Sequence, residues 1–153
     1  MTPTIRRATQ ADTPVLFEIR TSVRENHMTL AELAAEGVTP ASIEAWLASG
    51  SAAWLGFVDD VASGFAMARR DQRDLFALFV RPEAEHAGLG SALLRQAEAW
   101  LAAEGIEQPW LLTGGEAGLA APRFYEAHGW TLVEHMDNGD LHYTKRLIWP
   151  AWA

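Results

Sequence analysis

The chain has 153 residues, a formal net charge of -8, 49% hydrophobic residues and no cysteine. This length fits one domain, so we expect a single domain over residues 1–153, large enough to bury a sizeable core. The negative charge argues against nucleic-acid binding and favours a cationic small molecule or peptide as partner, while the lack of cysteine excludes a disulfide framework, a thiolate nucleophile and a cysteine metal site.

The first fifty residues are predicted to form a short strand followed by helices. Residues 4–8 fit a strand, and Thr9 and Asp12 then have the spacing of a capping box before a helix. A second apolar set follows before residue 37, and Pro40 at a first helical position opens a further helix that ends near Gly50. No run resembles a signal peptide or a membrane span, so we expect a cytoplasmic protein that does not bind a membrane.

The middle of the chain reads as an antiparallel meander. Residues 52–58 and 61–69 are strand-like and are separated by Asp59-Asp60, a hairpin turn signal. A central apolar strand begins at Leu75 and ends before Pro82, which has no N–H for a ladder. An amphipathic helix follows and ends near residue 105, because its apolar side chains recur at three- and four-residue spacing: Leu93, Leu94, Ala97, Trp100 and Leu101.

The last third is predicted to add a strand, a helix and a hairpin. Residues 109–113 read as a buried strand parallel to the central one, because a helix joins the two. Residues 120–128 read as a helix, and strands over 130–136 and 141–148 flank a turn containing Asn138-Gly139. The predicted fold class is therefore α/β (α+β), with a mixed, mostly antiparallel sheet of about six or seven strands and about four helices.

The loop between the central strand and its helix carries two glycines, Gly88 and Gly90. A glycine loop that opens a helix presents unpaired backbone N–H groups at the positive end of the helix dipole, which is a site for phosphate, although the same spacing also fits an ordinary tight turn. The P-loop pattern is excluded because its lysine is missing, and the dinucleotide pattern because Leu93 stands where a third glycine would be.

Two blocks of sequence resemble the GNAT superfamily of N-acetyltransferases. The first is Val80-Arg81-Pro82 followed by Glu85-His86-Ala87-Gly88-Leu89-Gly90. The second is Phe124-Tyr125-Glu126-Ala127-His128-Gly129-Trp130, and one helix and one strand are predicted between the blocks. The resemblance covers residues 75–130 with motifs and the rest of the chain by element order. It implies a GNAT-type fold and an enzyme that transfers the acetyl group of acetyl-CoA to an amine of a small molecule or peptide.

The resemblance also implies roles for particular residues. Tyr125 would be the general acid, with Tyr143 as the single alternative tyrosine. The pantetheine arm and the carbonyl oxygen would contact the strand backbone at Leu78, Phe79 and Val80. The diphosphate would lie on the backbone of the loop, at His86, Ala87, Gly88, Leu89, Gly90 and Ser91.

The acceptor side and the general base are less defined by sequence. Glu25 and Asn26 belong either to the solvated end of a helix or to a loop that recognises the acceptor amine. Asp74, Glu25 and His135 are candidate bases, each of which also reads as a solvated surface group. The histidines show no metal-site clustering, so no metal is expected, and a homodimer is compatible with the sequence.

One departure from the superfamily pattern lies in the cofactor loop. Glu85 and His86 stand where relatives carry arginine or glutamine and then glycine, which puts a negative charge near the expected diphosphate. The altered loop favours an alternative function, a catalytically silent module that binds CoA on the same fold, whereas retention of Tyr125 favours the enzyme.

Overall fold

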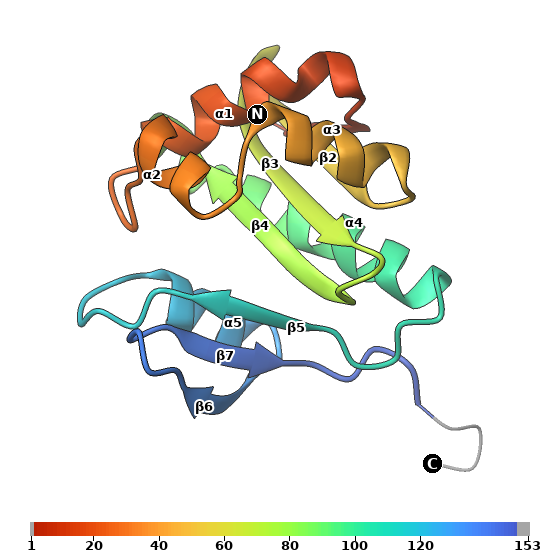
Figure 1. The fold of residues 1–153 in the computed structure, drawn as a ribbon, viewed down its shortest axis with the longest axis vertical. Coiled ribbons are helices and arrows are strands. Elements are labelled where there is room, and N and C mark those ends of the chain that lie inside the picture. The colour runs from red at the N-terminus through yellow and green to blue at the C-terminus, as the bar shows by residue number, and fades with distance from the viewer. Residues whose placement is uncertain (1, 150–153) are drawn as a thin grey trace.

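The computed structural model describes residues 2–149 and contains one seven-stranded sheet with helices on both faces (Figure 1). The strands are β1 (Thr4–Arg7), β2 (Ala52–Val58), β3 (Val61–Arg69), β4 (Asp74–Val80), β5 (Trp110–Thr113), β6 (Thr131–His135) and β7 (Leu141–Thr144). The α-helices are α1 (Thr13–Ser22), α2 (Leu30–Ala35), α3 (Pro40–Ala48), α4 (Leu89–Ala103) and α5 (Ala121–Ala127), and the 3₁₀ helices are η1 (Gln10–Asp12) and η2 (Pro82–Ala84).

The sheet is mixed and mostly antiparallel, with the order β1-β2-β3-β4-β5-β7-β6. This confirms the predicted fold class. Only β4 and β5 run parallel, and among the described residues a single pair, Asp74 with Trp110, joins them. Beyond that pair the two strands separate, and Figure 1 shows them running apart toward their C-terminal ends.

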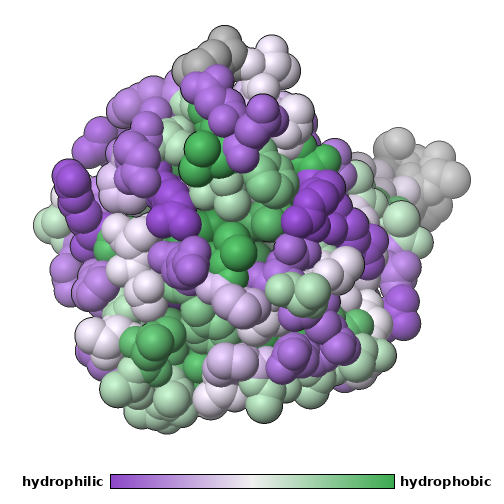
Figure 2. Space-filling model, turned by 90° about the horizontal axis from the view of Figure 1, so that it is seen from above, coloured by the Kyte–Doolittle hydropathy of each residue, from purple (hydrophilic) through white to green (hydrophobic). Residues whose placement is uncertain are grey.

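Two hydrophobic clusters hold the helices against opposite faces of the sheet. One cluster contains the buried face of α4 together with side chains of α5 and the neighbouring strands. The other contains side chains of α1, α2 and α3, which lie over β2, β3 and β4. The predicted apolar stripe of α4 is buried as expected, except that Trp100 is half-buried and packs edge-on against Trp54 at 6.1 Å. Seen from above, the outer surface shows apolar patches among mainly hydrophilic side chains (Figure 2).

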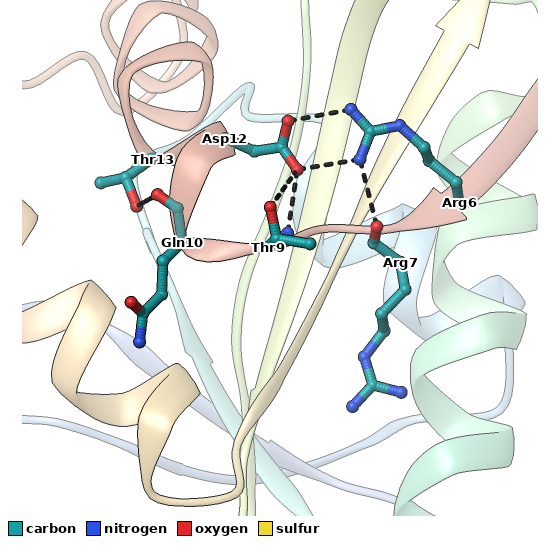
Figure 3. A network of polar contacts seen from close by, with 6 residues as sticks. All are labelled: Arg6, Arg7, Thr9, Gln10, Asp12 and Thr13. Carbon is teal, nitrogen blue, oxygen red and sulfur yellow. Dashed lines mark hydrogen bonds and ion pairs between the residues drawn. The ribbon is translucent and has the colours of Figure 1, made fainter.

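A capping box begins the helical segment after β1, as the sequence predicts. The backbone N–H of Thr9 donates to a carboxylate oxygen of Asp12 at 2.9 Å, and the Arg6 guanidinium donates to both oxygens of that carboxylate at 2.8 Å (Figure 3). One turn of 3₁₀ helix, η1, precedes α1 at this point. The network therefore joins the end of β1 to the start of the helix that follows it.

The β2–β3 hairpin forms at the predicted residues. Asp59 and Asp60 both adopt positive φ, 53° and 63°, which is the backbone of the two-residue turn that matches strand twist. In the last hairpin the prediction was wrong at one end, because β7 stops at Thr144 rather than continuing to residue 148. The chain there leaves β6 and instead bonds to the segment before β5, with the Leu147 N–H donating to the Glu107 carbonyl at 2.7 Å.

A bulge in β4 changes which side chains face α1. Met67 of β3 pairs with Ala77, whereas the next residue, Ala68, pairs with Leu75, so Phe76 is the extra residue on β4. Phe76 and Ala77 consequently pack on the same cluster, on the face that carries α1 to α3. The bulge thus places two consecutive side chains beside the opening between β4 and β5.

Candidate active site

The edge of β4 that faces β5 offers free backbone groups near its C-terminal end. The Arg81 N–H donates to the Ser63 carbonyl of the β3 side at 2.7 Å. Because backbone groups alternate sides along a strand, the N–H groups of Leu78 and Val80 point to the opposite edge, whereas that of Phe79 faces β3. Of the three predicted strand contacts, Leu78 and Val80 can therefore offer N–H donors to a ligand.

A cleft occupies the space where β4 and β5 diverge, and we call it the central cleft. It is lined by strand residues from β4 and β5, by the segment after α1 and by α5. The lining residues are Val23, Arg24, Glu25, Asn26, Leu75, Phe76, Ala77, Leu78, Phe79, Val80, Glu85, Leu112, Thr113, Leu119, Ala121 and Tyr125. The structure thus brings the predicted strand backbone, the predicted acid and the predicted acceptor-side residues to one cleft.

The glycine loop has the geometry of an anion-binding turn. Gly88 precedes α4 with φ 80°, and a Cβ at this position would meet no atom within 4 Å. The Ala92 N–H donates to the Gly88 carbonyl at 3.2 Å, so residues 89–91 have no acceptor within the helix for their N–H groups. These amides lie at the positive end of a fifteen-residue helix. The loop can therefore accept a phosphate without rearrangement of α4.

A second cleft lies over this loop and is continuous with the central cleft. We call it the loop cleft, and the two share Glu25, Leu78, Val80, Glu85, Ala121 and Tyr125. Its other lining residues are Ala84, His86, Gly88, Leu89, Gly90, Ser91, Ala120 and Phe124. All predicted loop residues except Ala87 line it.

Leu89 fixes the loop to the sheet through a contact that the sequence did not predict. Its side chain is buried and lies over Gly56 of β2 and Gly64 of β3, which pair with one another across the two strands. A Cβ on Gly64 would come within 3.0 Å of the Leu89 side chain, and a Cβ on Gly56 would come closer still. The two glycines therefore make room for Leu89, which seats the start of α4 on the sheet.

Ser91 and His128 connect the start of α4 to the end of α5. His128 Nδ1 lies 2.8 Å from the Phe124 carbonyl oxygen, so Nδ1–H donates there and Nε2 accepts from the Ser91 hydroxyl at 2.9 Å. The Ser91 side chain is thus engaged within the protein, while its backbone N–H remains at the loop cleft. This contact holds the two helices that flank the glycine loop together.

Tyr125 lies on α5 and lines both clefts. It is 7% exposed, and its ring packs edge-on against Phe124 and Trp130 at centroid distances of 5.3 and 6.2 Å. Burial raises the pKa of the Tyr125 hydroxyl above its ordinary value, so the group stays protonated at neutral pH. A protonated hydroxyl in this position can donate a hydrogen.

The other tyrosine, Tyr143, has a structural environment. It is fully buried on β7, and its hydroxyl donates to a carboxylate oxygen of Glu126 at 2.6 Å. Burial and the hydrogen bond to Glu126 raise the pKa of Tyr143 to about 12. Tyr143 does not line either cleft.

Glu25 lines both clefts, and Asn26 lines the central cleft. The Glu25 carboxylate accepts a hydrogen bond from the Ala120 N–H at 3.0 Å, beside the start of α5. Asn26 adopts positive φ, 53°, and lines the central cleft. Glu25 thus already has one partner within the protein, which the sequence could not indicate.

Glu85 and His86 lie in the loop between η2 and α4, and both side chains are exposed. Glu85 lines both clefts and His86 lines the loop cleft, with φ 72°. A carboxylate therefore lies at the loop, as the departure from the superfamily pattern suggested.

Asp74 is not the solvated group that the sequence suggested. It is 2% exposed and receives two hydrogen bonds from the Arg69 guanidinium, at 3.0 and 2.6 Å. Burial raises the pKa of Asp74, and the bonds from Arg69 oppose that rise. Asp74 therefore serves as a buried partner of Arg69, whereas His135 is exposed, as predicted.

A third cavity adjoins the central cleft on the side of α1 and α2, and we call it the apolar cavity. The two share Asn26, Phe76, Ala77, Phe79 and Leu112. Its remaining lining residues are Leu16, Phe17, Arg20, Met28, Leu33, Glu36, Val38, Ile43, Phe65 and Met67. Arg20 was not predicted as a site residue, because its one signal in the sequence is an arginine four residues after Leu16 on an apolar helix face.

Among residues 2–149, no group of three or more His, Asp or Glu side chains is arranged to hold a metal ion. None of the described helices has the length and apolar character needed to span a membrane.

Comparison with known proteins finds one matching family model and solved structures of the same fold. The model of the acetyltransferase (GNAT) family matches residues 16–130. The PaiA N-acetyltransferase of Thermoplasma acidophilum, solved with coenzyme A, is 20% identical and has a TM-score of 0.78, with 95% of this chain and 99% of that chain covered. No curated protein sequence matches the chain.

Two other solved structures have the same fold. The ribosomal-protein-S18-alanine N-acetyltransferase of Escherichia coli is 16% identical with a TM-score of 0.75, over 98% of this chain and 97% of that one. A GNAT-family acetyltransferase of Staphylococcus aureus Mu50 is 18% identical with a TM-score of 0.78, over 96% of this chain and 100% of that one.

Proposed function

Since the chain belongs to the GNAT family of acetyltransferases, we propose that it transfers the acetyl group of acetyl-CoA to an amine of a small molecule or peptide. Residues 1–153 would form one such domain. The observation that carries this proposal is the meeting of three features at two continuous clefts: the free edge of β4, the glycine loop and Tyr125.

The glycine loop would hold the diphosphate of CoA. Its support is the N–H groups of residues 89–91, which have no acceptor in α4, and the open space beside Gly88. A glycine there lets the backbone approach the ligand, and the dipole of α4 favours its negative charge. The loop residues with this role are His86, Ala87, Gly88, Leu89, Gly90 and Ser91.

The edge of β4 would bind the pantetheine arm and orient the thioester. Leu78 and Val80 direct backbone N–H groups toward the central cleft, where they can donate to amide and carbonyl oxygens of the cofactor. Phe79, whose own N–H faces β3, contributes its side chain to the wall of the cleft. Acetyl-CoA supplies an acetyl group activated as a thioester.

Tyr125 would act as general acid in this cleft. The amine nitrogen attacks the thioester carbonyl carbon, so that an N–C bond forms and the C–S bond breaks. The departing sulfur takes a proton from the Tyr125 hydroxyl, and the proton lost by the amine restores the tyrosine through water. Because burial raises its pKa, the Tyr125 hydroxyl carries this proton at neutral pH before the reaction begins.

Two measurements test the proposed function together. Calorimetry with CoA and acetyl-CoA reports binding, and a thiol reagent reports CoA release when amines of different classes are added. Binding with amine-dependent release is expected. Binding without release for any amine would favour the silent CoA-binding module, which Glu85 at the loop supports, and absence of binding would overturn both functions.

A further inference from the structure

The apolar cavity has the position of an acceptor site. It lies beside α1 and α2 and is lined mainly by apolar side chains. It opens into the central cleft through side chains that both share, including Phe76 and Phe79. A molecule in this cavity could extend one end toward the free edge of β4.

The cavity contains one buried cationic group. Its lining is apolar except for Arg20, Asn26 and Glu36. Arg20 is 8% exposed, and its Nη1 is the buried side-chain nitrogen or oxygen that lacks a hydrogen-bond partner among residues 2–149. The guanidinium carbon lies 4.2 Å from the ring centroid of Phe79. The guanidinium is therefore held against the wall that the apolar cavity shares with the central cleft.

A buried guanidinium nitrogen without a hydrogen-bond partner is costly in an apolar cavity, and this cost points to a ligand. Burial lowers the pKa of Arg20, and the charge of Glu36 opposes that effect without forming a hydrogen bond to Nη1. The Phe79 ring and the charge of Glu36 offset part of this cost, but a buried N–H donor without an acceptor loses its hydration and forms no hydrogen bond in return. An anionic group bound in the cavity would supply the acceptor that the described residues do not.

We propose that the acceptor substrate is an amine that also carries a carboxylate, joined to an aliphatic or aromatic group, and that Arg20 binds this carboxylate. The apolar group lies in the cavity among side chains such as Met28 and Leu33, and the amine extends into the central cleft. An amino acid with an apolar side chain has this chemistry, and so does a peptide with an acidic side chain close to its N-terminus.

This proposal rests on the proposed function and narrows it. The net charge of -8 favours cationic partners at long range, whereas Arg20 adds a local requirement for an anion. A planar guanidinium can donate two parallel hydrogen bonds to a carboxylate, which makes the contact selective as well as strong. The acceptor would therefore be zwitterionic rather than a polyamine or a simple alkylamine.

The first test compares acceptors that differ only in the carboxylate. The matched set is L-phenylalanine, L-phenylalaninamide and phenethylamine, repeated with L-methionine, its amide and its decarboxylated amine. We expect kcat/KM for the free acid to exceed that of its amide by roughly ten- to a hundredfold, because a hydrogen bond to a charged group contributes about that much to binding. A peptide with N-terminal Ala-Asp and its Ala-Asn counterpart distinguish the peptide source from the free amino acid.

The second test uses Arg20→Met, with Arg7→Met as its matched control. Arg7 also lies over an aromatic ring, that of Trp54 at 5.5 Å, but is exposed and outside the cavity. Arg20→Met should raise KM for the free acid roughly ten- to a hundredfold and leave its kcat unchanged. The KM and kcat of the amide substrates should stay at their native values. The Tm should equal or exceed the native value. Arg7→Met should alter none of the acceptor constants.

A binding measurement separates this proposal from the proposed function. N-acetyl-L-phenylalanine and its amide have no free amine, so their binding to the protein saturated with CoA does not depend on turnover. The acid should bind at least tenfold more tightly than the amide, and Arg20→Met should remove the difference. Equal binding of acid and amide to the native protein would overturn the proposal, and so would a lower Tm in Arg20→Met with an unchanged preference between acid and amide.

Discussion

Glu25 accepts a hydrogen bond from the backbone N–H of Ala120 at 3.0 Å, although 95 residues separate them. The contact ties the segment after α1 to the start of α5, the helix that carries Tyr125. A carboxylate at a helix N-terminus also interacts favourably with the helix dipole. The candidate acid is thus positioned in part by a residue from the acceptor side of the cleft.

Glu25→Ala is expected to lower both stability and turnover. Loss of a helix-terminal hydrogen bond costs about 1 kcal/mol, which corresponds to roughly 2 to 4 °C in Tm for a domain of this size. The kcat should fall because α5 loses its tether, and thermal unfolding with steady-state kinetics measures both effects. Glu116→Ala removes an exposed carboxylate from the loop before α5 and should change neither; equal effects of the two variants would contradict the positioning role.

Gly88→Ala is expected to weaken CoA binding beyond its effect on stability. Its positive φ, 80°, disfavours any side chain, while no atom within 4 Å would meet the added Cβ. Gly37 has the same properties, with φ 82°, and lies far along the chain from the loop. The two alanine variants should therefore lose similar stability, roughly 1 kcal/mol.

Calorimetry then separates the two variants, because only Gly88 lies at the loop cleft. Gly90→Val adds a test without backbone strain, since a Cβ at Gly90 makes ordinary contacts with Phe124 at 3.5 Å. Native CoA affinity in both Gly88→Ala and Gly90→Val would remove the loop from the cofactor site.

Local sequence signals predicted the elements, whereas contacts across the fold were not predictable from them. The β2–β3 hairpin was placed correctly because two consecutive aspartates tolerate the positive φ of its turn. The packing of Leu89 on Gly56 and Gly64 depends on three elements coming together, so no local sequence pattern predicts it. The single β4–β5 pair is likewise a property of the assembled sheet.

The candidate site also combines residues that were predicted from motifs with residues that were not predicted. Motif resemblance predicted Tyr125 and the glycine loop, and the structure brings them to continuous clefts. Arg20 was missed because a charged residue on a helix reads as solvent-exposed, and its burial results from packing of α1 over β4. Asp74 was expected to be solvated because its partner Arg69 lies on the neighbouring strand, and no local pattern indicates that pairing.

Glu85→Arg is expected to increase CoA affinity. Glu85 is exposed beside the loop cleft, where its charge opposes a bound diphosphate. Replacing it by arginine exchanges a repulsive charge for an attractive one, and added salt should reduce the gain because exposed charges are screened. Glu83→Arg, an exposed neighbour on η2 that lines neither cleft, is the control. If both variants bind CoA like the native protein at low ionic strength, the Glu85 side chain does not face the diphosphate.

Asp12→Asn is expected to change how the stability of the protein depends on pH. Hydrogen bonds from Arg6 are the main cause that lowers the pKa of Asp12 to about 2, from 3.8 (Figure 3). A carboxyl group with a depressed pKa in the folded state stabilises the protein above its unfolded pKa, and this contribution is lost as pH falls toward the folded pKa. The Tm difference between native and variant should therefore be constant above pH 4 and shrink between pH 4 and about 2. Asp71→Asn, at an exposed aspartate, should follow the native curve; a Tm difference for Asp12→Asn that did not vary with pH would contradict the assignment.

Tyr125→Phe is expected to lower kcat by roughly 10² to 10⁴, the usual contribution of a positioned acid. The substitution keeps the ring and its contacts with Phe124 and Trp130 and deletes only the hydroxyl. CoA affinity and Tm should change little, because an interaction made only in the transition state lowers kcat rather than raising KM.

Tyr143→Phe is the control, and the structure gives it a distinct signature. It removes the part-buried hydrogen bond to Glu126, which should cost about 1 kcal/mol of stability. Its turnover should stay near native at temperatures below its Tm, because Tyr143 lines neither cleft. The pair of variants therefore separates catalysis from stability: the acid assignment requires lost turnover with native Tm in one and lowered Tm with retained turnover in the other. Native turnover in Tyr125→Phe would mean that another group, or water, protonates the thiolate.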